Sequence, residues 1–294
     1  MIELIKQIPV ANELGEGVIW DHHRQRVWWT DIVNSKLYRY DPANDELEEF
    51  TTPERLACFA PVQGQEHLIA AFASGFAFYN PDNGKLDWIR KIEEDNPGTR
   101  LNDGRTDRQG RFWAGTMVED RDQASNRGSL YCLDADLQVT KTIEELLITN
   151  SLCWSPDGQI MYHCDTPTQK IDSYLFDPES AAISEHMIFT TAEKGCYPDG
   201  SIIDAEGYLW NAQWGGSKVV RYAPDGSVDL ELAMPVSQPS CVAFAGVNLD
   251  LLVVTTAHQD LSAEAREHEP GAGDLFIYQT DFAGLIESPF KSAT

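Results

Sequence analysis

The chain has 294 residues, of which 42% are hydrophobic and 23% charged, a composition that provides a folded core and excludes wholesale disorder. Lys and Arg number 22 against 47 Asp and Glu, which gives a formal net charge of −25. This acidic balance repels nucleic acid and anionic membranes, so neither is expected as a partner. The N-terminal residues lack the apolar run of a signal peptide and no stretch is apolar enough to span a membrane, which predicts a cytoplasmic protein.

A unit of short strands recurs along the chain. Each copy contains stretches rich in Val, Ile, Tyr, Trp and Phe, separated by turns of the Asp-Gly or Asn-Gly type. The copies follow one another at intervals of roughly 40 to 50 residues, the period of a four-stranded propeller blade. They begin near Gly15, Ala57, Leu101, Asn150, Pro198 and Pro239.

These six copies predict an all-β fold, a single six-bladed β-propeller over residues 1–294 with four strands in each blade. The N-terminal MIELIKQI is expected to join the last blade as a strand, which closes the ring and removes its free edges. Helical periodicity is nearly absent, and the polar SAEAREHEP (262–270) is interpreted as a surface insertion in the last copy. A large β-sandwich is the alternative fold, but it does not explain the six copies.

Six cysteines are scattered through the chain without a CxxC pair or a short-range framework. Several stand in apolar, strand-like surroundings such as SLCWS and SCVAF. We therefore expect reduced and mostly buried thiols rather than disulfides or a metal site. They are Cys58, Cys132, Cys153, Cys164, Cys196 and Cys241.

The segment Arg100–Met117, RLNDGRTDRQGRFWAGTM, is the most informative stretch for function. It places a cation and two polar side chains at the head of a strand, where they are poor choices for filling a core. They suit a ligand that carries hydroxyl or carbonyl groups, bound at the mouth of a β-structure. Taken alone, the segment is better explained as a hairpin with charged turn residues, and the rest of the chain reverses that preference.

Oxygen-bearing side chains recur at the start of several copies. In a propeller the first strand of each blade lines the central channel, so residues at this position converge in space. These residues are Glu16, Asn102 with Asp103, Asn150 and Asp199. Two carboxylates and a carboxamide oxygen form a hard, anionic pocket suited to a divalent cation.

Each of these residues taken singly is also compatible with an ordinary turn, because Asp-Gly and Asn-Ser are common turn pairs. Their coincidence across a closed ring favours a site. His22 and His23 are interpreted as turn residues between two strands. No GxSxG, HExxH or Walker motif is present, which lowers the case for a serine hydrolase or a nucleotide-binding protein.

Five motifs carry a resemblance to a known family: LGEGVIWD, RLNDGRTDRQGRFWAGTM, TNSLCWSPDGQIMYHCDT, YPDGSIID and LWNAQWGGSKVVRYAPDG. Together the chain resembles, nearly end to end, the gluconolactonase family that includes senescence marker protein 30 and bacterial sugar lactonases. The resemblance implies a six-bladed propeller with one divalent cation at the channel mouth. It further implies that Glu16, Asn150 and Asp199 bind the metal, and that Arg100 and Asn102 hold the substrate.

The resemblance also assigns substrate binding to Asp120, the acidic residue after GTM. Animal members have Glu there, so their sugar preferences are not transferred to this chain. Cys196 and Tyr197 precede the expected ligand Asp199 and are expected to shape the pocket. Trp214 is either an aromatic wall for the sugar ring or a packing residue.

On this basis we expect hydrolysis of an aldonolactone, a pentonolactone or a hexonolactone, to the aldonic acid. A divalent cation would polarise the lactone, and Asp199, kept ionised by that cation, would serve as the general base. The cation is left open among calcium, zinc, manganese, magnesium and iron. The expected partner is a small-molecule sugar lactone, and a monomer is expected.

Two other functions stay open. The same metal site suits hydrolysis of organophosphates or other esters, and a calcium-binding propeller without chemistry is the alternative from a different class. A carboxylate aimed at bound water, as expected for Asp199, favours catalysis over pure binding. A protein-interaction propeller is disfavoured, because the copies lack WD dipeptides and the expected pocket is small and polar.

Overall fold

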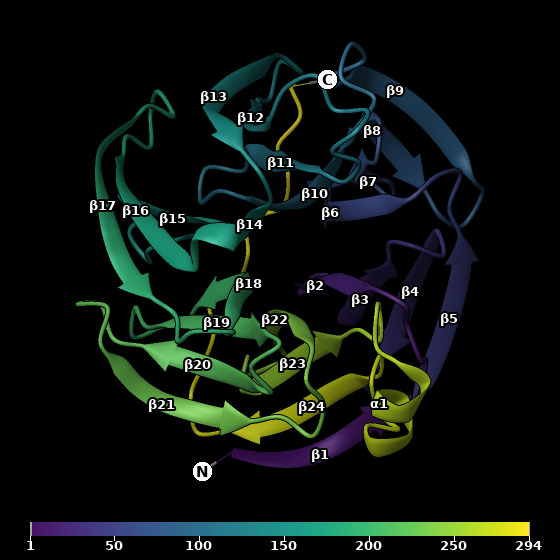
Figure 1. Cartoon of the computed structure of the whole chain (residues 1–294). Coiled ribbons are helices and arrows are strands. Elements are labelled where there is room, and N and C mark those ends of the chain that lie inside the picture. The colour runs from purple at the N-terminus through teal and green to yellow at the C-terminus, as the bar shows by residue number, and fades with distance from the viewer. Residues whose placement is uncertain (1, 294) are drawn as a thin grey trace.

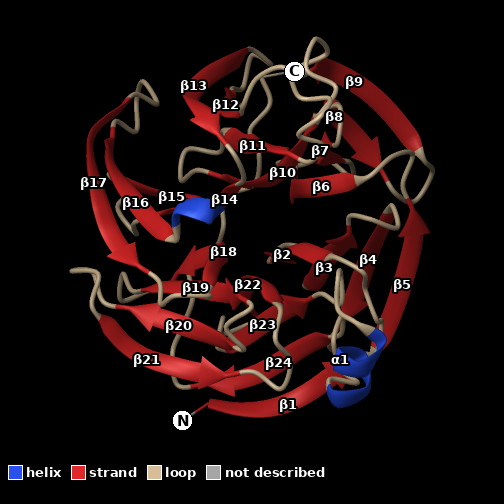
Figure 2. Ribbon diagram, viewed as in Figure 1, coloured by secondary structure: helices blue, strands red, loops and turns tan. Residues whose placement is uncertain are grey.

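Six antiparallel sheets of four strands each form a ring in the computed structural model, which describes residues 2–293 (Figure 1). Strands account for almost all of the regular structure, as Figure 2 shows. This arrangement confirms the predicted all-β, six-bladed propeller. No helix within the described residues is long and apolar enough to cross a membrane.

The strands of each blade follow one another along the chain, from the inner edge of the blade to its outer edge, except in the last blade. The first three blades contain β2 Gly15–Asp21, β3 Arg26–Asp31, β4 Lys36–Asp41 and β5 Glu46–Thr51; β6 Leu56–Pro61, β7 Leu68–Phe72, β8 Gly75–Asn80 and β9 Lys85–Lys91; and β10 Thr99–Thr106, β11 Phe112–Val118, β12 Gly128–Leu133 and β13 Val139–Leu146. The other three contain β14 Thr149–Trp154, β15 Ile160–Asp165, β16 Lys170–Phe176 and β17 Ile183–Thr191; β18 Tyr197–Ile203, β19 Leu209–Trp214, β20 Lys218–Tyr222 and β21 Val228–Ala233; and β22 Pro239–Ala245, β23 Leu251–Thr256, β24 Leu275–Thr280 and β1 Ile2–Ile8.

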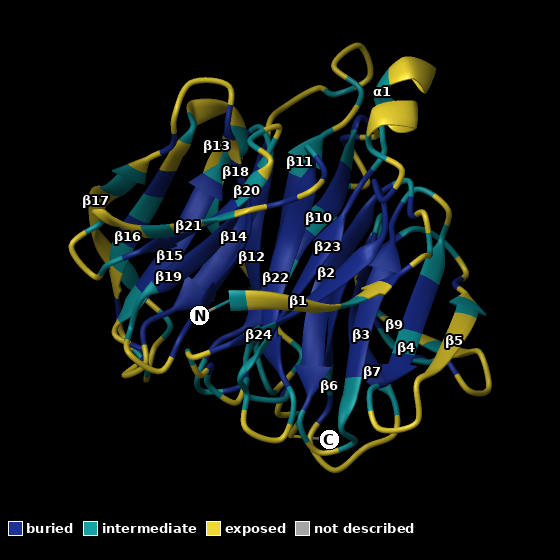
Figure 3. Ribbon diagram, turned by 90° about the horizontal axis from the view of Figure 1, so that it is seen from below, coloured by how far each residue is buried: buried dark blue, intermediate teal, exposed yellow. Residues whose placement is uncertain are grey.

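The inner strands β2, β6, β10, β14, β18 and β22 pack against one another in this order, and β22 returns to β2. Every residue of β2 and of β22 is buried, whereas five of the six residues of the outer strand β5 are exposed. Figure 3 shows the same gradient of burial from the inner strands to the outer ones. The first strand of each copy therefore forms the wall of the channel, as expected from the sequence.

The last blade is closed by the N-terminal strand, as predicted. β1 pairs antiparallel with β24, from Ile2 opposite Thr280 to Ile8 opposite Leu275. This pairing covers the edge of β24 and joins the first strand of the chain to the last one within one sheet. The insertion predicted at 262–270 contains the short helix α1 (Ala263–His268), which has no buried residue.

All six cysteines are free and buried, as expected.

Buried aspartates fix the turn between the first two strands in several of the blades. Asp204 accepts hydrogen bonds from the backbone N–H groups of Glu206 and Tyr208 (both 3.0 Å) with one carboxylate oxygen. Its other oxygen accepts from Trp210 Nε1 and Arg221 Nε, both at 2.9 Å. Asp107 binds its own turn, a tryptophan and an arginine in the same way in the third blade. One carboxylate thus ties a turn to the core and to a buried guanidinium.

Replacing Asp204 by Asn leaves the Arg221 guanidinium without this buried carboxylate, because the amide carries no charge. We expect the free energy of unfolding to fall by about 3 kcal/mol in urea titrations. The matched control is Asp225→Asn, in an exposed turn where the carboxylate bonds only to Ser227, with an expected change below about 0.5 kcal/mol. Equal effects of the two substitutions would contradict this interpretation.

Candidate metal centre

In every blade the first two strands slip out of register near the start of the inner strand. Such a bulge leaves residues unpaired and redirects their side chains. In four blades the bulge falls beside an oxygen-bearing residue singled out from the sequence; in the other two it falls beside Leu56 and Pro239, which offer no side-chain oxygen. The four bulges lie between Glu16 and Ile19, Leu101 and Gly104, Asn150 and Cys153, and Pro198 and Ser201.

The bulge at Glu16 depends on the glycine that follows it. Gly17 has a φ of 59°, and a Cβ atom there would lie 3.1 Å from the carbonyl oxygen of Ala57. The Gly17 N–H donates to Glu16 Oε2 at 2.9 Å, which holds the carboxylate close to its own backbone. The backbone conformation of the GEG sequence therefore positions the Glu16 carboxylate at the channel mouth.

Glu16 and Asp199 meet at this mouth. Their carboxyl groups share a hydrogen bond, and the two residues are only 8% and 6% exposed. Burial, with the nearby charge of Asp103, raises the pKa of Glu16 to about 8. Burial and the charge of Glu16 raise the pKa of Asp199 well above its usual range. Both shifts oppose ionisation of the pair, and a cation beside the two carboxylates would favour their ionised forms.

Asn150 is the third expected ligand and lies on β14, which packs against the strand of Asp199. Its Nδ2 donates to Thr166 Oγ1 at 2.8 Å, and Thr166 Oγ1 donates to the carbonyl of Pro198 at 3.0 Å. Its Oδ1 accepts a 3.3 Å hydrogen bond from Asn102 Nδ2. These contacts fix the carboxamide and tie it to the residue that precedes Asp199.

The donor set fits a hard divalent cation. Two buried carboxylates held together are destabilised by desolvation and mutual repulsion, and a cation between them would relieve both. Among residues 2–293, no three His, Cys, Asp or Glu side chains are arranged to hold a metal ion together. A cation at this mouth would thus need the Asn150 oxygen in addition to the two carboxylates.

Arg100 is buried and contacts Asn102. Its Nη1 donates to Asn102 Oδ1 at 2.9 Å and its Nε to Glu119 Oε1 at 2.9 Å. Glu119 also accepts a bidentate pair of hydrogen bonds from Arg55, with Nη1 to Oε1 at 2.7 Å and Nη2 to Oε2 at 2.8 Å. Arg100 therefore orients the Asn102 carboxamide, whose Nδ2 bonds to the Thr149 carbonyl at 3.0 Å as well as to Asn150.

The carboxylate of Asp120 is engaged by its own turn. It accepts hydrogen bonds from the N–H groups of Asp122 and Gln123 and from the Gln123 side chain. The adjacent Glu119 is the acidic residue that contacts Arg100. Substrate binding by Asp120 therefore stays a prediction, and the structure connects Glu119 rather than Asp120 to the other selected residues.

Sequence reasoning missed the roles of Glu119 and Arg55 and noted Asp103 without assigning it to the site. Asp103 is buried and accepts from the N–H groups of Gly104 (2.8 Å) and Leu152 (3.4 Å). The sequence feature that could have assigned Asp103 to the site is its position beside Asn102 in RLND. No signal in the sequence pairs Arg55 with Glu119, because they belong to different blades.

Two further pocket residues lie at the same mouth. Tyr197 and Trp214 pair across β18 and β19. Tyr197 is 39% exposed, whereas Trp214 is half-buried and packs against an apolar cluster that contains Leu14 and Ala57. Trp214 thus has a packing role in the protein, and its use as a sugar-facing wall stays a prediction.

The comparisons with known proteins identify the family of this chain. The family model described as SMP-30/Gluconolactonase/LRE-like region matches residues 14–258. An L-arabinolactonase of Azospirillum brasilense is 38% identical over 280 residues, 95% of this chain and 92% of that protein. A 6-deoxy-6-sulfogluconolactonase of Pseudomonas putida is 34% identical over 281 residues, 94% of each chain. A solved structure of a calcium-binding protein, regucalcin, from Agrobacterium tumefaciens superposes with a TM-score of 0.91 at 30% identity, covering 98% of this chain and 97% of that one.

The fold and the site together define a six-bladed propeller with two buried carboxylates at one mouth of its channel. The chain belongs to the SMP-30/gluconolactonase/LRE-like family. This finding confirms the resemblance seen in the sequence motifs.

Glu16→Gln tests two expected effects of the carboxylate pair: mutual repulsion in the metal-free protein, and affinity for a divalent cation. In chelator-treated protein the substitution removes one of two repelling groups, so we expect a higher unfolding temperature than in the unsubstituted protein. Calcium or manganese ions should raise the unfolding temperature of the unsubstituted protein by mass action, and metal affinity should fall at least about tenfold in Glu16→Gln.

Differential scanning fluorimetry with and without added metal measures both effects. Asp120→Asn is the control, and it should keep the full metal-dependent shift because Asp120 bonds to its own turn. A metal-dependent shift that is unchanged in Glu16→Gln would contradict the assignment of this ligand.

Proposed function

We propose that this protein is a metal-dependent sugar lactonase that hydrolyses an aldonolactone to its open-chain aldonic acid. The observation that carries the proposal is the pair of buried, adjoining carboxylates Glu16 and Asp199 at the channel mouth, beside the amide groups of Asn102 and Asn150. Lactonases from Azospirillum brasilense and Pseudomonas putida support the reaction class.

In the proposed site Glu16, Asn150 and Asp199 would hold one divalent cation. When bound, the cation supplies Lewis acidity toward the lactone carbonyl oxygen and an electric field that favours ionised Asp199. Oxygen-only ligation suits calcium, magnesium and manganese best. The similarity to a calcium-binding regucalcin makes calcium the first cation to test.

The reaction requires a water molecule to attack the carbonyl carbon and the ring C–O bond to break. Asp199 is assigned as the general base that accepts the proton of the attacking water. Asn102 is assigned to orient a substrate oxygen, with its carboxamide held in place by Arg100. Arg100 Nη2 is the donor left to face the substrate, because Nε and Nη1 bond to Glu119, Leu101 and Asn102.

The proposal is tested with a panel of aldonolactones, followed by acid release at controlled pH on chelated protein resupplied with single metals. L-arabinono-, D-xylono-, D-glucono- and D-galactonolactone compare five-carbon with six-carbon acids. Turnover that requires one added divalent cation supports the proposal. Full turnover in metal-stripped protein would overturn the metal-dependent mechanism.

Asp199→Asn keeps an oxygen at the metal but removes the base. We expect kcat to fall by about 10²–10⁴-fold, with no recovery in excess metal. Glu16→Gln should lose activity in proportion to metal occupancy and regain much of it in excess metal. Steady-state kinetics across a metal titration distinguishes the two variants, with Asp225→Asn as a control of unchanged activity.

The alternatives predict different results in the same assays. A protein that binds calcium but opens no lactone would be a non-catalytic calcium-binding propeller. Faster turnover of an aryl ester or a phosphotriester than of every lactone would favour the ester or organophosphate hydrolase. Full lactonase activity in Asp199→Asn would remove Asp199 from the role of base.

A further inference from the structure

Two residues outside the candidate metal centre hold Arg100. Glu119 directly follows β11 in the third blade, and Arg55 directly precedes β6 in the second. Glu119 Oε1 accepts hydrogen bonds from Arg100 Nε at 2.9 Å and from Arg55 Nη1 at 2.7 Å, and its Oε2 accepts from Arg55 Nη2 at 2.8 Å. One carboxylate therefore joins two guanidinium groups across the boundary between two blades.

The backbone on both sides of this contact is fixed. The Glu119 N–H donates to the carbonyl of Gly98 at 2.9 Å, and the N–H of Ala73 donates to the carbonyl of Arg55 at 2.8 Å. The carbonyl of Ala73 accepts in turn from the Leu101 N–H at 3.0 Å, which ties the second blade to β10. A bidentate bond between a carboxylate and a guanidinium also restricts their relative orientation. The fold therefore sets the position of the Glu119 carboxylate before any ligand binds.

The charges of the three side chains depend on one another. Arg100 is only 5% exposed, and burial lowers the pKa of its guanidinium. The Glu119 carboxylate opposes this shift of the Arg100 pKa, and the positive charge of Arg55 adds to it. The two guanidinium groups therefore repel one another, and Glu119 offsets the repulsion. Without the charge of Glu119, two like charges would face each other beside the channel mouth.

On its other side Arg100 contacts the residues of the channel mouth. Its Nη1 donates to Asn102 Oδ1 at 2.9 Å, and Asn102 Nδ2 donates to Asn150 Oδ1 at 3.3 Å. Burial raises the pKa of Glu16 to about 8, and the charge of Arg100 opposes this shift. The guanidinium thus acts on one expected metal ligand through its charge and on another through Asn102.

An arginine side chain that is free to rotate loses conformational entropy when a ligand orders it. The contact with Glu119 orders Arg100 in advance, and the bidentate contact with Arg55 orders Glu119. Because binding and catalysis depend steeply on the placement of each donor, a small displacement of Arg100 should be costly.

We propose that Glu119 and Arg55 are positioning residues for substrate binding. Arg55 fixes the Glu119 carboxylate, and Glu119 fixes Arg100 so that its Nη2 is left for the substrate. Both residues act through Arg100. The part of this proposal that concerns the substrate rests on the proposed lactonase function, whereas the part that concerns the orientation of Arg100 does not.

Glu119→Gln and Arg55→Met test the proposal in protein saturated with a divalent cation. Gln keeps the size of Glu but not its charge, so the guanidinium groups repel and KM for the lactone should rise about tenfold. Arg55→Met leaves the pair of Arg100 and Glu119 but frees the carboxylate, and KM should rise about threefold. We expect kcat to stay within about twofold in both variants. A variant that only loses folded protein would instead lower the apparent kcat and leave KM unchanged.

Two double variants test whether the effect passes through Arg100. Arg55→Met combined with Glu119→Gln removes the repelling cation as well, so its KM should be lower than in Glu119→Gln alone. In an Arg100→Met background, Glu119→Gln should cause no further rise in KM. Glu48→Gln is the matched control, because Glu48 on β5 accepts a similar bidentate pair from Arg39, at 2.6 and 2.8 Å, far from the channel mouth. It should keep both kinetic constants.

The orientation of Arg100 is measured separately from turnover, by exchange of its Nε–H proton with water in ¹⁵N-labelled protein. The signal is assigned from its absence in Arg100→Lys. We expect slow exchange in the unsubstituted protein and in Glu48→Gln. Exchange should be at least about tenfold faster in Glu119→Gln, with Arg55→Met in between.

Faster exchange together with a raised KM supports the proposal. Unchanged exchange in both Glu119→Gln and Arg55→Met would overturn it, and so would faster exchange with an unchanged KM. A double variant whose KM is not lower than that of Glu119→Gln would refute the role of charge repulsion. If the unsubstituted protein opened no lactone with any cation, the proposed function would fail instead, and the exchange rates would still decide whether the two residues position Arg100.

Discussion

The closeness of two buried carboxylates is the constraint on which the functional part of this protein depends. Glu16 and Asp199 lie 183 positions apart in the sequence, and they meet because the inner strands close into a ring. Bringing them together without a cation is unfavourable, since desolvation and repulsion both penalise the charged pair. The rest of the fold must therefore supply the stability that holds the site together.

Ring closure supplies this stability. The N-terminal strand β1 completes the last sheet, so the first and last strands of the chain stabilise a single blade. Buried inner strands pack around the channel, and aspartates such as Asp204 anchor the turns behind them. The metal centre thus rests on rigid strands rather than on loops, which suits a site that must hold like charges in contact.

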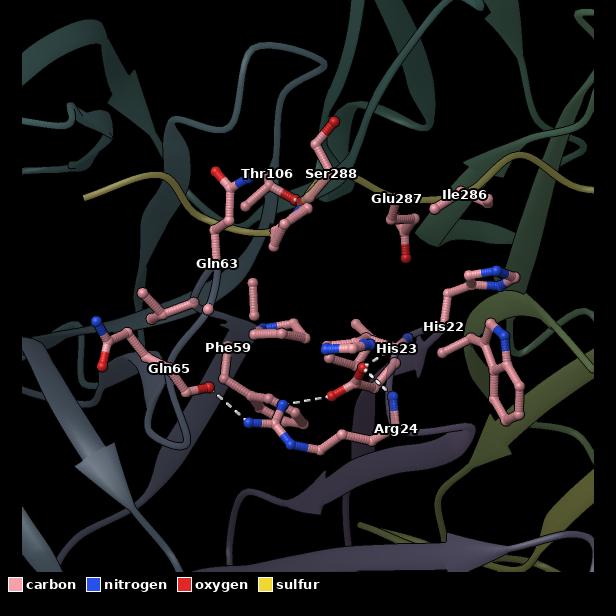
Figure 4. A pocket seen from close by; sticks show the side chains of 18 of the residues that line it. His22, His23, Arg24, Phe59, Gln63, Gln65, Thr106, Ile286, Glu287 and Ser288 are labelled. Atoms are coloured by element: carbon pink, nitrogen blue, oxygen red, sulfur yellow. Dashed lines mark hydrogen bonds and ion pairs between the residues drawn. The ribbon is translucent and has the colours of Figure 1, made fainter. Parts of the chain in front are cut away.

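The two ends of the channel differ because the same strands carry different residues at their two ends. At the start of the inner strands the bulges present carboxylates and carboxamides. At the end of β2, β6 and β10 apolar residues alternate with charged and polar ones around a cavity (Figure 4), and the C-terminal segment forms one of its walls. The two mouths therefore differ in the side chains that they present.

The sequence by itself determined the fold and predicted which residues gather at one mouth of the channel. Six copies of one strand pattern specify six blades, and the position of Glu16, Asn150 and Asp199 within their copies indicates one mouth, because equivalent positions in a closed ring face the same channel. The place of the N-terminal strand could be predicted as well, since a strand outside the six copies is expected to complete the blade that lacks one.

Only the tertiary structure decided which neighbours surround those ligands. Asp120 and Glu119 are adjacent in sequence, yet Glu119 bonds to Arg100 and Arg55 while Asp120 bonds to its own turn. The partnership of Arg55 with Glu119 and the burial of Asp103 also arise from contacts between blades. Such contacts depend on side-chain direction across a closed ring, and the local periodicity of a strand does not encode that direction.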